Sequence, residues 1–558
     1  MLHGDTSSFG AANAPNRSNE EIDPTLNDWP ALQAVRLFPG LPEIPLLPAT
    51  ADQSAIERTK AALLDITREM VGPTDGEEGT YLGPTPAGYT YFGQFVFHDI
   101  VFSQIFGLRR PTGEIFHLKN ASSQGLDLSG LYGRGPVVDA HLYDVPDGRD
   151  LTACRFPIGL PRRKDNACPI GRAEKGRDLP RIDMSGKFLS TKGRKQPYRP
   201  LVADPRNDDN LVLSQMLSTL MCAHNRIVDF LLREKTNHCE EASPADAYRR
   251  AKAYLTAVYR NVVIGDYLKK IMNQCVWRHF FGRPLSFDSN VSALATYNAL
   301  PLEFTFGASR FAHAMVRQSY VVNENSADEA ASLRRMLSFS SLRPGCDIPI
   351  PVNWTIDWER FVPVRGATHV QSARRISPFL SKELTVASLS AELDGTARPV
   401  AFMDCWRCYD LELPSGQTVA KAVQEALAGS GIEVEALTEE NMLPTEACSR
   451  RYVYNAGRLR EALLRYPEFL TETPLSYYII QEASVEGCDG AHLGPVGSYI
   501  VGATVAAALF RSVDFDPTAE SLLADVEPKT LGGLLSLGDS ELMPDDRFEC
   551  LVRRHAVG

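Results

Sequence analysis

The stretch Gly93-Gln94-Phe95-Val96-Phe97-His98-Asp99-Ile100 lies inside an apolar, aromatic run that extends from Thr90 to Gln104. Such a segment is expected to be buried, yet Gln94, His98 and Asp99 are costly to bury without hydrogen-bond partners. On a helix, Gln94 and His98 share a face, and Asp99 points about 100° away from His98. We therefore expect a buried helix that offers an imidazole and an amide to a cavity and a carboxylate to another partner. The alternative is that His98 is an ordinary core histidine, hydrogen-bonded to neighbouring groups of the protein.

Composition excludes several classes of protein. The chain has 558 residues and a formal net charge of −11, which disfavours a general nucleic-acid binder because phosphate contacts need a basic face. No apolar run reaches the ~18 residues of a transmembrane helix, and no secretory signal is visible, so we expect a cytoplasmic protein. The eleven cysteines are scattered and odd in number. They predict no disulfide framework, and Cys405 and Cys408 alone do not predict zinc.

Helical periodicity dominates the chain, and strand-like alternation is scarce and short. We expect helices over residues 52–70, 204–232, 243–267, 303–318, 327–338, 414–428, 457–466, 474–485 and 495–510. The sequence therefore predicts a mainly α fold, with a single large helical domain over 51–515 that has long irregular loops and little β structure. An extended N-terminal arm, 1–50, precedes it, and a C-terminal segment, 516–558, follows. Residues 137–203 are irregular and basic and predict long surface connections.

The loop over 120–136 places oxygen-bearing side chains at Ser123, Asp127 and Ser129, with the carbonyl of Gly125 between them. Alternating oxygen ligands on a loop suit a hard cation such as calcium. Loops of serine, glycine and aspartate are common, so an ordinary surface loop is the alternative.

Two further residues stand out. Arg206 lies at the mouth of the expected helix 204–232, where a guanidinium could project into a pocket. His313 lies in the apolar stretch 303–318, and its small neighbours Ala312 and Ala314 leave room for a flat group.

In this combination the sequence resembles the animal-type haem peroxidases of the peroxidase–cyclooxygenase superfamily, in their shorter bacterial form. The resemblance covers roughly residues 80–515. The matching positions are Gly93-Gln94 and His98-Asp99, then Ser123, Gly125, Asp127 and Ser129, then Asp204, Arg206, Asp209 and His224-Asn225-Arg226, and finally Arg310 and His313.

The resemblance implies a role for each distal residue. His98 is expected to act as the base that moves the proton of hydrogen peroxide between its oxygens. Arg206 is expected to stabilise the charge on the departing oxygen, and Gln94 to order a water or halide above the iron. Asp99 is expected to join Ser123, Gly125, Asp127 and Ser129 around calcium.

On the proximal side, the resemblance implies that His313 is the axial ligand of the haem iron. Asp404 is expected to accept a hydrogen bond from the other ring nitrogen of His313. The alternative for Asp404 is an unrelated surface acid. Arg310 and Arg407 are expected to bind the haem propionates.

Three positions depart from the family pattern. Phe97 stands where the family has an aspartate that esterifies the haem, and Asp209 stands where it has the second ester-forming residue, a glutamate. We therefore expect largely non-covalent haem b. Asp404 replaces an asparagine, which is expected to lower the iron's reduction potential and to disfavour halide oxidation.

The resemblance thus implies a peroxidase that reduces hydrogen peroxide and oxidises a small organic donor. One alternative is a fatty-acid dioxygenase of the same superfamily, whose tyrosyl radical would sit three residues before the proximal histidine, where this chain has Arg310. Another is a non-catalytic haem-binding scaffold. The sequence names neither the donor nor the oligomeric state.

Overall fold

The computed structural model describes most of the chain. The described residues are 32–42, 52–72, 81–101, 119–120, 125–144, 154–162, 178–183, 198–234, 243–282, 288–296, 299–324, 330–341, 346–385, 398–444, 453–512 and 525–556.

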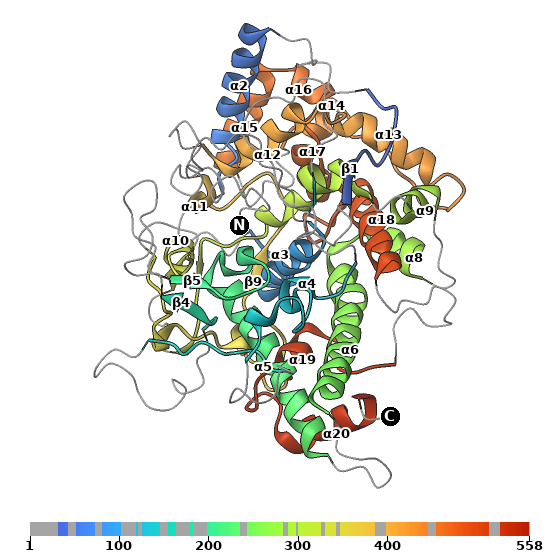
Figure 1. Ribbon diagram of the computed structural model, residues 1–558. Helices are drawn as coiled ribbons and strands as arrows, with labels where there is room; N and C mark the ends of the chain where they lie inside the picture. Colours follow the sequence, from blue (N-terminus) through green and yellow to red (C-terminus); the bar gives the residue numbers. More distant parts are fainter. Residues whose placement is uncertain are drawn as a thin grey trace, which may run out of the picture.

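Helix α3 (Gly88–Ile100) lies near the middle of the molecule (Figure 1), and every one of its residues is buried. It packs against α5 (Leu211–Arg233), which packs in turn against α6 (Pro244–Val262). On the other side of the molecule, α17 (Leu475–Glu486) packs against α12 (Val400–Asp410) and α18 (Pro495–Arg511). The core is therefore built from helices, and the predicted mainly α fold is confirmed.

Other helices surround this core. They are α2 (Gln53–Arg68), α4 (Ser129–Tyr132), α8 (Gln274–Phe281), α9 (Ser289–Thr296), α10 (Leu333–Leu337), α11 (Lys382–Thr385), α13 (Gly416–Ala426), α14 (Glu439–Met442), α15 (Val453–Arg465), α16 (Glu468–Thr471), α19 (Leu531–Ser536) and α20 (Asp545–Ala556). Several begin at side chains that cap the first turn, as at Asp52 and Ser415. Within the described residues, no helix has the length and apolar character needed to cross a membrane.

The strands are short and form small sheets. β1 (Leu32–Val35) runs parallel to β6 (Ala299–Pro301), with Gln33 opposite Ala299, and antiparallel to β3 (Lys119–Asn120). The other sheets are two-stranded pairs, β2 (Leu82–Pro86) with β9 (Ser372–Arg374), β4 (Arg181–Asp183) with β5 (Tyr198–Pro200), and β7 (Ser319–Tyr320) with β8 (Ala331–Ser332).

Three expected helices differ in detail from the prediction. Within the described part of the segment 327–338, Ala331–Ser332 form β8, and α10 covers only Leu333–Leu337 because Ser332 caps its first turn. The first difference along the chain is at Asp204, where a helix was expected to open. Instead a 3₁₀ turn, η6 (Pro205–Asp208), precedes α5, and Asn210 starts α5 by accepting from the backbone N–H of Leu213. Asp204 likewise accepts from the N–H of Arg206. Aspartate and asparagine side chains that bond to nearby backbone compete with a continuous helix, which explains the break.

The second difference concerns residues 303–318. This segment is a π-helix, η8 (Glu303–Gly307), followed by a 3₁₀ helix, η9 (Ala308–His313), so the helix ends at His313. Gly307 joins the two with φ −104° and ψ −85°. π and 3₁₀ segments inside helices often mark functional positions.

The expected helix 243–267 starts as predicted, because the Ser243 side chain accepts from the N–H of Asp246. It continues from α6 into a π-helix, η7 (Val263–Leu268), and then α7 (Lys269–Ile271).

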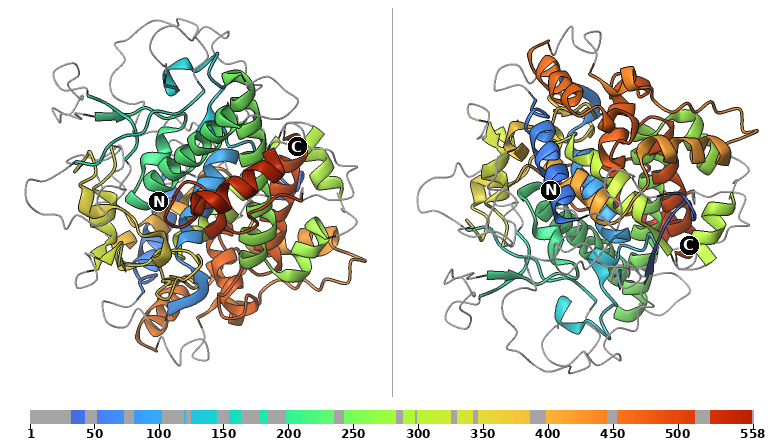
Figure 2. Two further views of the ribbon diagram at one scale, coloured as in Figure 1. Left: turned by 90° about the horizontal axis from the view of Figure 1, so that it is seen from below. Right: turned by 90° about the horizontal axis from the view of Figure 1, so that it is seen from above.

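The first and the last described segments pack on this body. β1 of the N-terminal arm pairs with β6, and α19 and α20 pack against α5 and α6. Seen from below (Figure 2, left), the red C-terminal helices lie beside the green helices. The predicted domain boundaries stay predictions.

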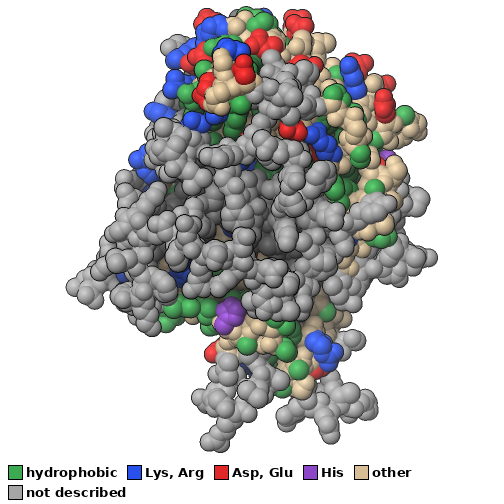
Figure 3. Space-filling view, turned by 45° about the horizontal axis from the view of Figure 1, so that its top comes forward, with side chains coloured by type: hydrophobic (Ala, Val, Ile, Leu, Met, Phe, Trp, Pro, Cys, Tyr) green, Lys and Arg blue, Asp and Glu red, His purple; other side chains and the backbone are tan. Residues whose placement is uncertain are grey.

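Charges of both signs are mixed on the face shown in Figure 3, where blue and red side chains alternate near the top. Two ion pairs join α15 to α2. Arg465 pairs with Asp65 at 2.8 Å, and Arg458 pairs with Glu69, just after α2, at 2.8 Å.

Candidate active site

Helix α3 is held close to its neighbour η7 through Gly93. A Cβ at this position would lie 2.2 Å from the Tyr267 hydroxyl, so only glycine allows this approach. The helical period then directs Gln94 and His98 toward η6 and Asp99 toward the loop at residues 128–129. The arrangement of these three side chains on two faces follows the prediction.

The imidazole of His98 is fixed by Asn207. The amide oxygen of Asn207 can only accept, so His98 Nδ1 donates to it at 2.9 Å, and the neutral ring carries its lone pair at Nε2. Burial, together with the positive charge of Arg206, lowers the pKa of His98 from its ordinary 6.5 to about 4. His98 is therefore neutral at neutral pH, and Nε2 can accept a proton.

Arg206 lies against the C-terminal end of α3. Its guanidinium donates to the carbonyl oxygen of His98 at 2.9 Å and to that of Val101, and it is paired with Asp204 at 2.6 Å. The sequence suggested a guanidinium that projects into a pocket. The structure instead anchors it on the helix that carries His98, where it acts on His98 through its charge.

Gln94 contacts Asp209, the residue expected to replace the family's ester-forming glutamate. Its amide nitrogen donates to Asp209 Oδ2 at 3.1 Å, and its amide oxygen accepts from the Asn210 side chain at 3.1 Å. The structure therefore brings Gln94 and Asp209 together beside His98.

Four consecutive residues thus make four different contacts. Arg206 binds the end of α3, Asn207 binds the His98 ring, Asp209 binds Gln94, and Asp208 points to a different partner, described below. Sequence reasoning missed Asn207. Asn207 lies between Arg206 and Asp209, two predicted site residues, and this position in the sequence is the signal that could have identified it.

On the proximal side, His313 is 2% exposed. Its Nδ1 donates to Asp404 Oδ2 at 2.6 Å, a short charge-assisted hydrogen bond. The expected contact between His313 and Asp404 is therefore present. It leaves the lone pair of the neutral ring at Nε2, as for His98.

Arg310 borders the same cavity as His313. That cavity is also lined by Asp404, Cys405, Ser476 and Tyr477. The Arg310 guanidinium lies 5.5 Å from the centre of the Phe306 ring.

Arg407 lies one turn after Asp404 on α12 and is buried. Its Nη1 is 3.1 Å from Asp410 Oδ2, so part of its charge is already balanced by the protein. A propionate at Arg407 would have to share the guanidinium with Asp410.

Phe97 lies in an aromatic cluster. Its ring packs edge-on against Phe304 and Phe311, with centres 5.2 Å and 6.0 Å apart, and against Tyr267. Phe97, expected to replace a haem-linking carboxylate of the family, therefore contributes apolar packing here.

The loop after residue 124 closes on Asp99. The Asp99 carboxylate accepts from the backbone N–H groups of Leu128 and Ser129 at 3.1 and 2.6 Å and from the Ser129 hydroxyl at 2.7 Å. Burial and the nearby Asp127 carboxylate raise the pKa of Asp99 to about 6, although the Ser129 hydrogen bonds oppose this. Asp99, Asp127 and Ser129 thus lie in one cluster. Ser123 lies outside the described residues.

Arg260 of α6 enters this cluster. Its guanidinium is ion-paired with Asp127 at 2.5 Å and donates to the Leu126 carbonyl at 2.9 Å. Among the described residues, no three His, Cys, Asp or Glu side chains form a metal-binding group. A cation here would therefore depend on hydroxyl and carbonyl oxygens as well as on the two carboxylates.

Comparison with solved structures gives relatives with the same fold. Peroxidase A from Dictyostelium discoideum matches over 94% of this chain and 93% of its own, with 14% sequence identity and a TM-score of 0.55. A fatty acid alpha-dioxygenase from Arabidopsis thaliana matches over 92% of this chain and 76% of its own, with 14% identity and a TM-score of 0.51. At this identity the likeness concerns the fold alone.

Sequence comparison identifies the family. No curated protein matches the sequence. The model of the family described as animal haem peroxidase matches residues 109–387, half of the chain, a region that includes Arg206 and His313 but not His98 or Asp404. That this chain is a bacterial-type member stays a prediction. The match shows that the chain belongs to the animal haem peroxidase family.

Proposed function

We propose that this protein is a haem-dependent peroxidase that reduces hydrogen peroxide and oxidises a small organic donor. One observation carries the proposal. Two buried histidines, His98 on α3 and His313 at the end of η9, are each fixed at Nδ1, one by a neutral amide and the other by a carboxylate. α3 and η9 pack against each other, so both imidazoles belong to one part of the core.

The donor set on the proximal side fits haem b. Because His313 Nδ1 donates to Asp404, its Nε2 lone pair is the one that would bind the iron, and a carboxylate partner makes that nitrogen a stronger ligand. Arg310, which borders the same cavity, suits a propionate. When bound, haem supplies the iron at which the oxygen–oxygen bond of peroxide is cleaved.

His98 fits the role of the base. A neutral imidazole with its lone pair at Nε2 takes a proton from one oxygen of hydrogen peroxide and delivers it to the other, which leaves as water. The hydrogen bond to Asn207 keeps the ring in the required tautomer.

Arg206 supports this base by its charge. A guanidinium beside the ring disfavours a second positive charge and so keeps His98 neutral. The stabilisation of a departing oxygen that the resemblance implies for Arg206 is part of this proposal, as is a water-ordering role for Gln94.

Two finer points belong to the same proposal. Haem is held largely without covalent bonds, because Phe97 has no carboxyl group and Asp209 is one methylene shorter than glutamate. Calcium would be held by the cluster of Asp99, Asp127 and Ser129. The Asp99 carboxylate is buried and the negative charge of Asp127 lies near it, which favours a cation there.

Fatty-acid dioxygenation is the second candidate, since an alpha-dioxygenase shares the fold. The tyrosine that such chemistry would need three residues before His313 is replaced by Arg310. Oxygen uptake with a fatty acid and no peroxide would favour this candidate.

Stopped-flow mixing of the haem-loaded protein with hydrogen peroxide tests the proposal. His98→Gln is expected to slow the reaction by about 10²–10⁴ while haem stays bound. The matched control is His224→Gln, because His224 is equally buried but is held by Tyr132 and the Cys154 carbonyl. An unchanged rate in His98→Gln would contradict the assignment. A haem-supplied wild-type protein without a Soret band would bind no haem, and the proposed haem-dependent function would fail.

A further inference from the structure

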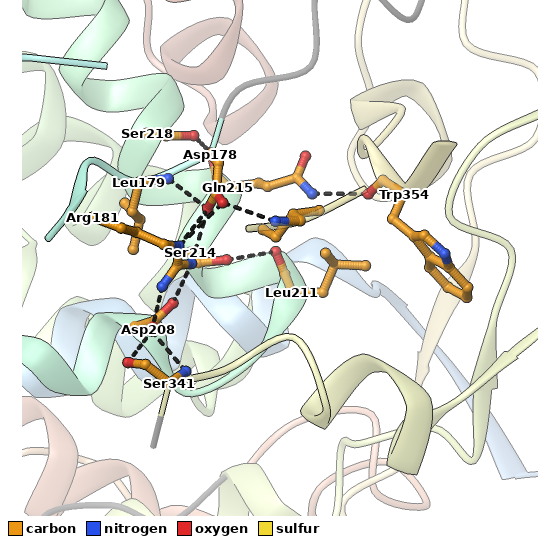
Figure 4. Close-up of polar contacts among 11 residues, drawn as sticks. Asp178, Leu179, Arg181, Asp208, Leu211, Ser214, Gln215, Ser218, Ser341 and Trp354 are labelled. Carbon is orange, nitrogen blue, oxygen red and sulfur yellow. Dashed lines mark hydrogen bonds and ion pairs between the residues drawn. The ribbon is translucent and has the colours of Figure 1, made fainter. Parts of the chain in front are cut away.

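Arg181 lies between two buried carboxylates. Figure 4 shows its guanidinium between Asp178 and Asp208, and all three side chains are at most 3% exposed. Nη1 and Nη2 contact the two Asp208 oxygens at 2.9 Å each, and Nη2 contacts Asp178 Oδ1 at 2.8 Å. Because carboxylates hold the planar guanidinium of Arg181 on two sides, both its position and its orientation are fixed.

Each carboxylate has a second anchor. Asp208 accepts from the backbone N–H of Ser341 at 2.9 Å and from its hydroxyl. Asp178 accepts from the backbone N–H of Ile350 at 2.9 Å. The charged cluster therefore joins β4 and η6 to the chain at residues 341 and 350.

This placement matters because Asp208 follows Asn207. Asn207 binds the His98 ring, whereas Asp208 binds Arg181, so the two contacts tie one short turn to two different parts of the molecule. Gly130 leaves the space that Asn207 needs, since a Cβ there would lie 2.8 Å from Asn207 Nδ2. Movement of η6 would therefore displace the acceptor of His98.

We propose that Arg181 is a positioning residue for His98, acting through Asp208 and Asn207. The proposal rests on the proposed function, in which His98 moves the proton of peroxide. Arg181 touches neither His98 nor the reacting atoms. It holds the turn that orients the base.

Two variants weaken the anchor while keeping side chains of similar size. Arg181→Lys keeps the positive charge but loses the forked contact, and Asp208→Asn keeps the shape but loses the ion pair. The matched control is Asp178→Asn, which changes the same buried cluster on the side that does not contact η6.

Arg181→Lys and Asp208→Asn are expected to lower the second-order rate with peroxide on the order of 10-fold, because small displacements of a catalytic group are costly. Asp178→Asn is expected to stay within about twofold. In an Asn207→Ala background, the effect of Arg181→Lys is expected to shrink below about twofold, since the route through Asn207 is already lost.

Hydrogen–deuterium exchange gives a readout that does not depend on turnover. Arg181→Lys is expected to speed exchange in peptides covering residues 205–210, with little change in α17 or α18. Equal rate losses in Arg181→Lys and Asp178→Asn, an undiminished effect in the Asn207→Ala background, or uniformly faster exchange would each overturn the proposal. If the wild-type protein does not react with peroxide, the proposed function fails, and the exchange pattern still tests the positioning on its own.

Discussion

Replacing Asn207 by aspartate would place a carboxylate where a neutral amide now holds the imidazole of His98, the proposed base. The contact between Asn207 Oδ1 and His98 Nδ1 is 2.9 Å. At an effective dielectric constant of about 20, opposite unit charges at that separation attract by ~6 kcal/mol. The pKa of His98 is about 4, and ~4 kcal/mol suffices to make the imidazolium the main form at neutral pH. We therefore expect His98 to be protonated in Asn207→Asp.

A protonated imidazole cannot take a proton from peroxide. The reaction of the haem-loaded variant is expected to fall by about 10²–10⁴ at neutral pH and to recover as the pH rises. The assay is stopped-flow spectroscopy from about pH 5 to about pH 9, with haem content measured in parallel.

Asn207→Ala is the matched control. This variant removes the hydrogen-bond acceptor of His98 without adding a charge. The rate of the reaction with peroxide is therefore expected to fall, but the pH at which activity is lost on acidification is expected to stay below neutral. An Asn207→Asp profile that coincides with that of the wild type would refute the reasoning, because either Asn207 does not face His98 or His98 is not the base.

Four further predictions concern other parts of the molecule. Asp404→Asn is expected to raise the iron's reduction potential, measured by spectroelectrochemistry, because a neutral acceptor donates less charge through the proximal ring. Asp127→Asn is expected to lower thermal stability and calcium content, and calcium-free native protein on elemental analysis would contradict the calcium proposal. Acidified organic solvent is expected to extract intact haem b, whereas haem retained by the polypeptide would mean that Asp209 forms an ester. Burial lowers the pKa of His224 from its ordinary 6.5 to about 4, so the neutral ring contributes stability above pH 6.5 that is lost as pH falls toward 4. Wild type is therefore expected to lose about 3 kcal/mol more than His224→Gln in denaturant titrations across that range.

Local patterns predicted much of the fold. The burial of α3 follows from its aromatic composition, and its two polar faces follow from the helical period. The start of α6 follows from the cap at Ser243. The contact between His313 and Asp404 also matches the expectation, although 91 positions separate the two residues. In that case the family pattern supplied the long-range information.

Other features depend on partners that no local pattern reveals. Arg181 lies in the basic stretch 137–203, which predicted surface connections, yet it is buried against the carboxylates of Asp178 and Asp208. The π and 3₁₀ segments before His313 differ from an α-helix by small changes in backbone hydrogen bonding, which periodicity does not resolve. The break before α5 depends on which of several aspartates and asparagines bonds to the backbone.

The complete burial of α3 has a consequence for making the protein. All 13 residues of this helix are covered in the folded molecule, so a partly folded chain would expose an aromatic, apolar segment to other chains. Aggregation then competes with the closure of α5 and η7 over α3. Substitutions that slow this closure are expected to lower the yield of soluble protein in expression trials, even when each molecule that does fold retains full activity.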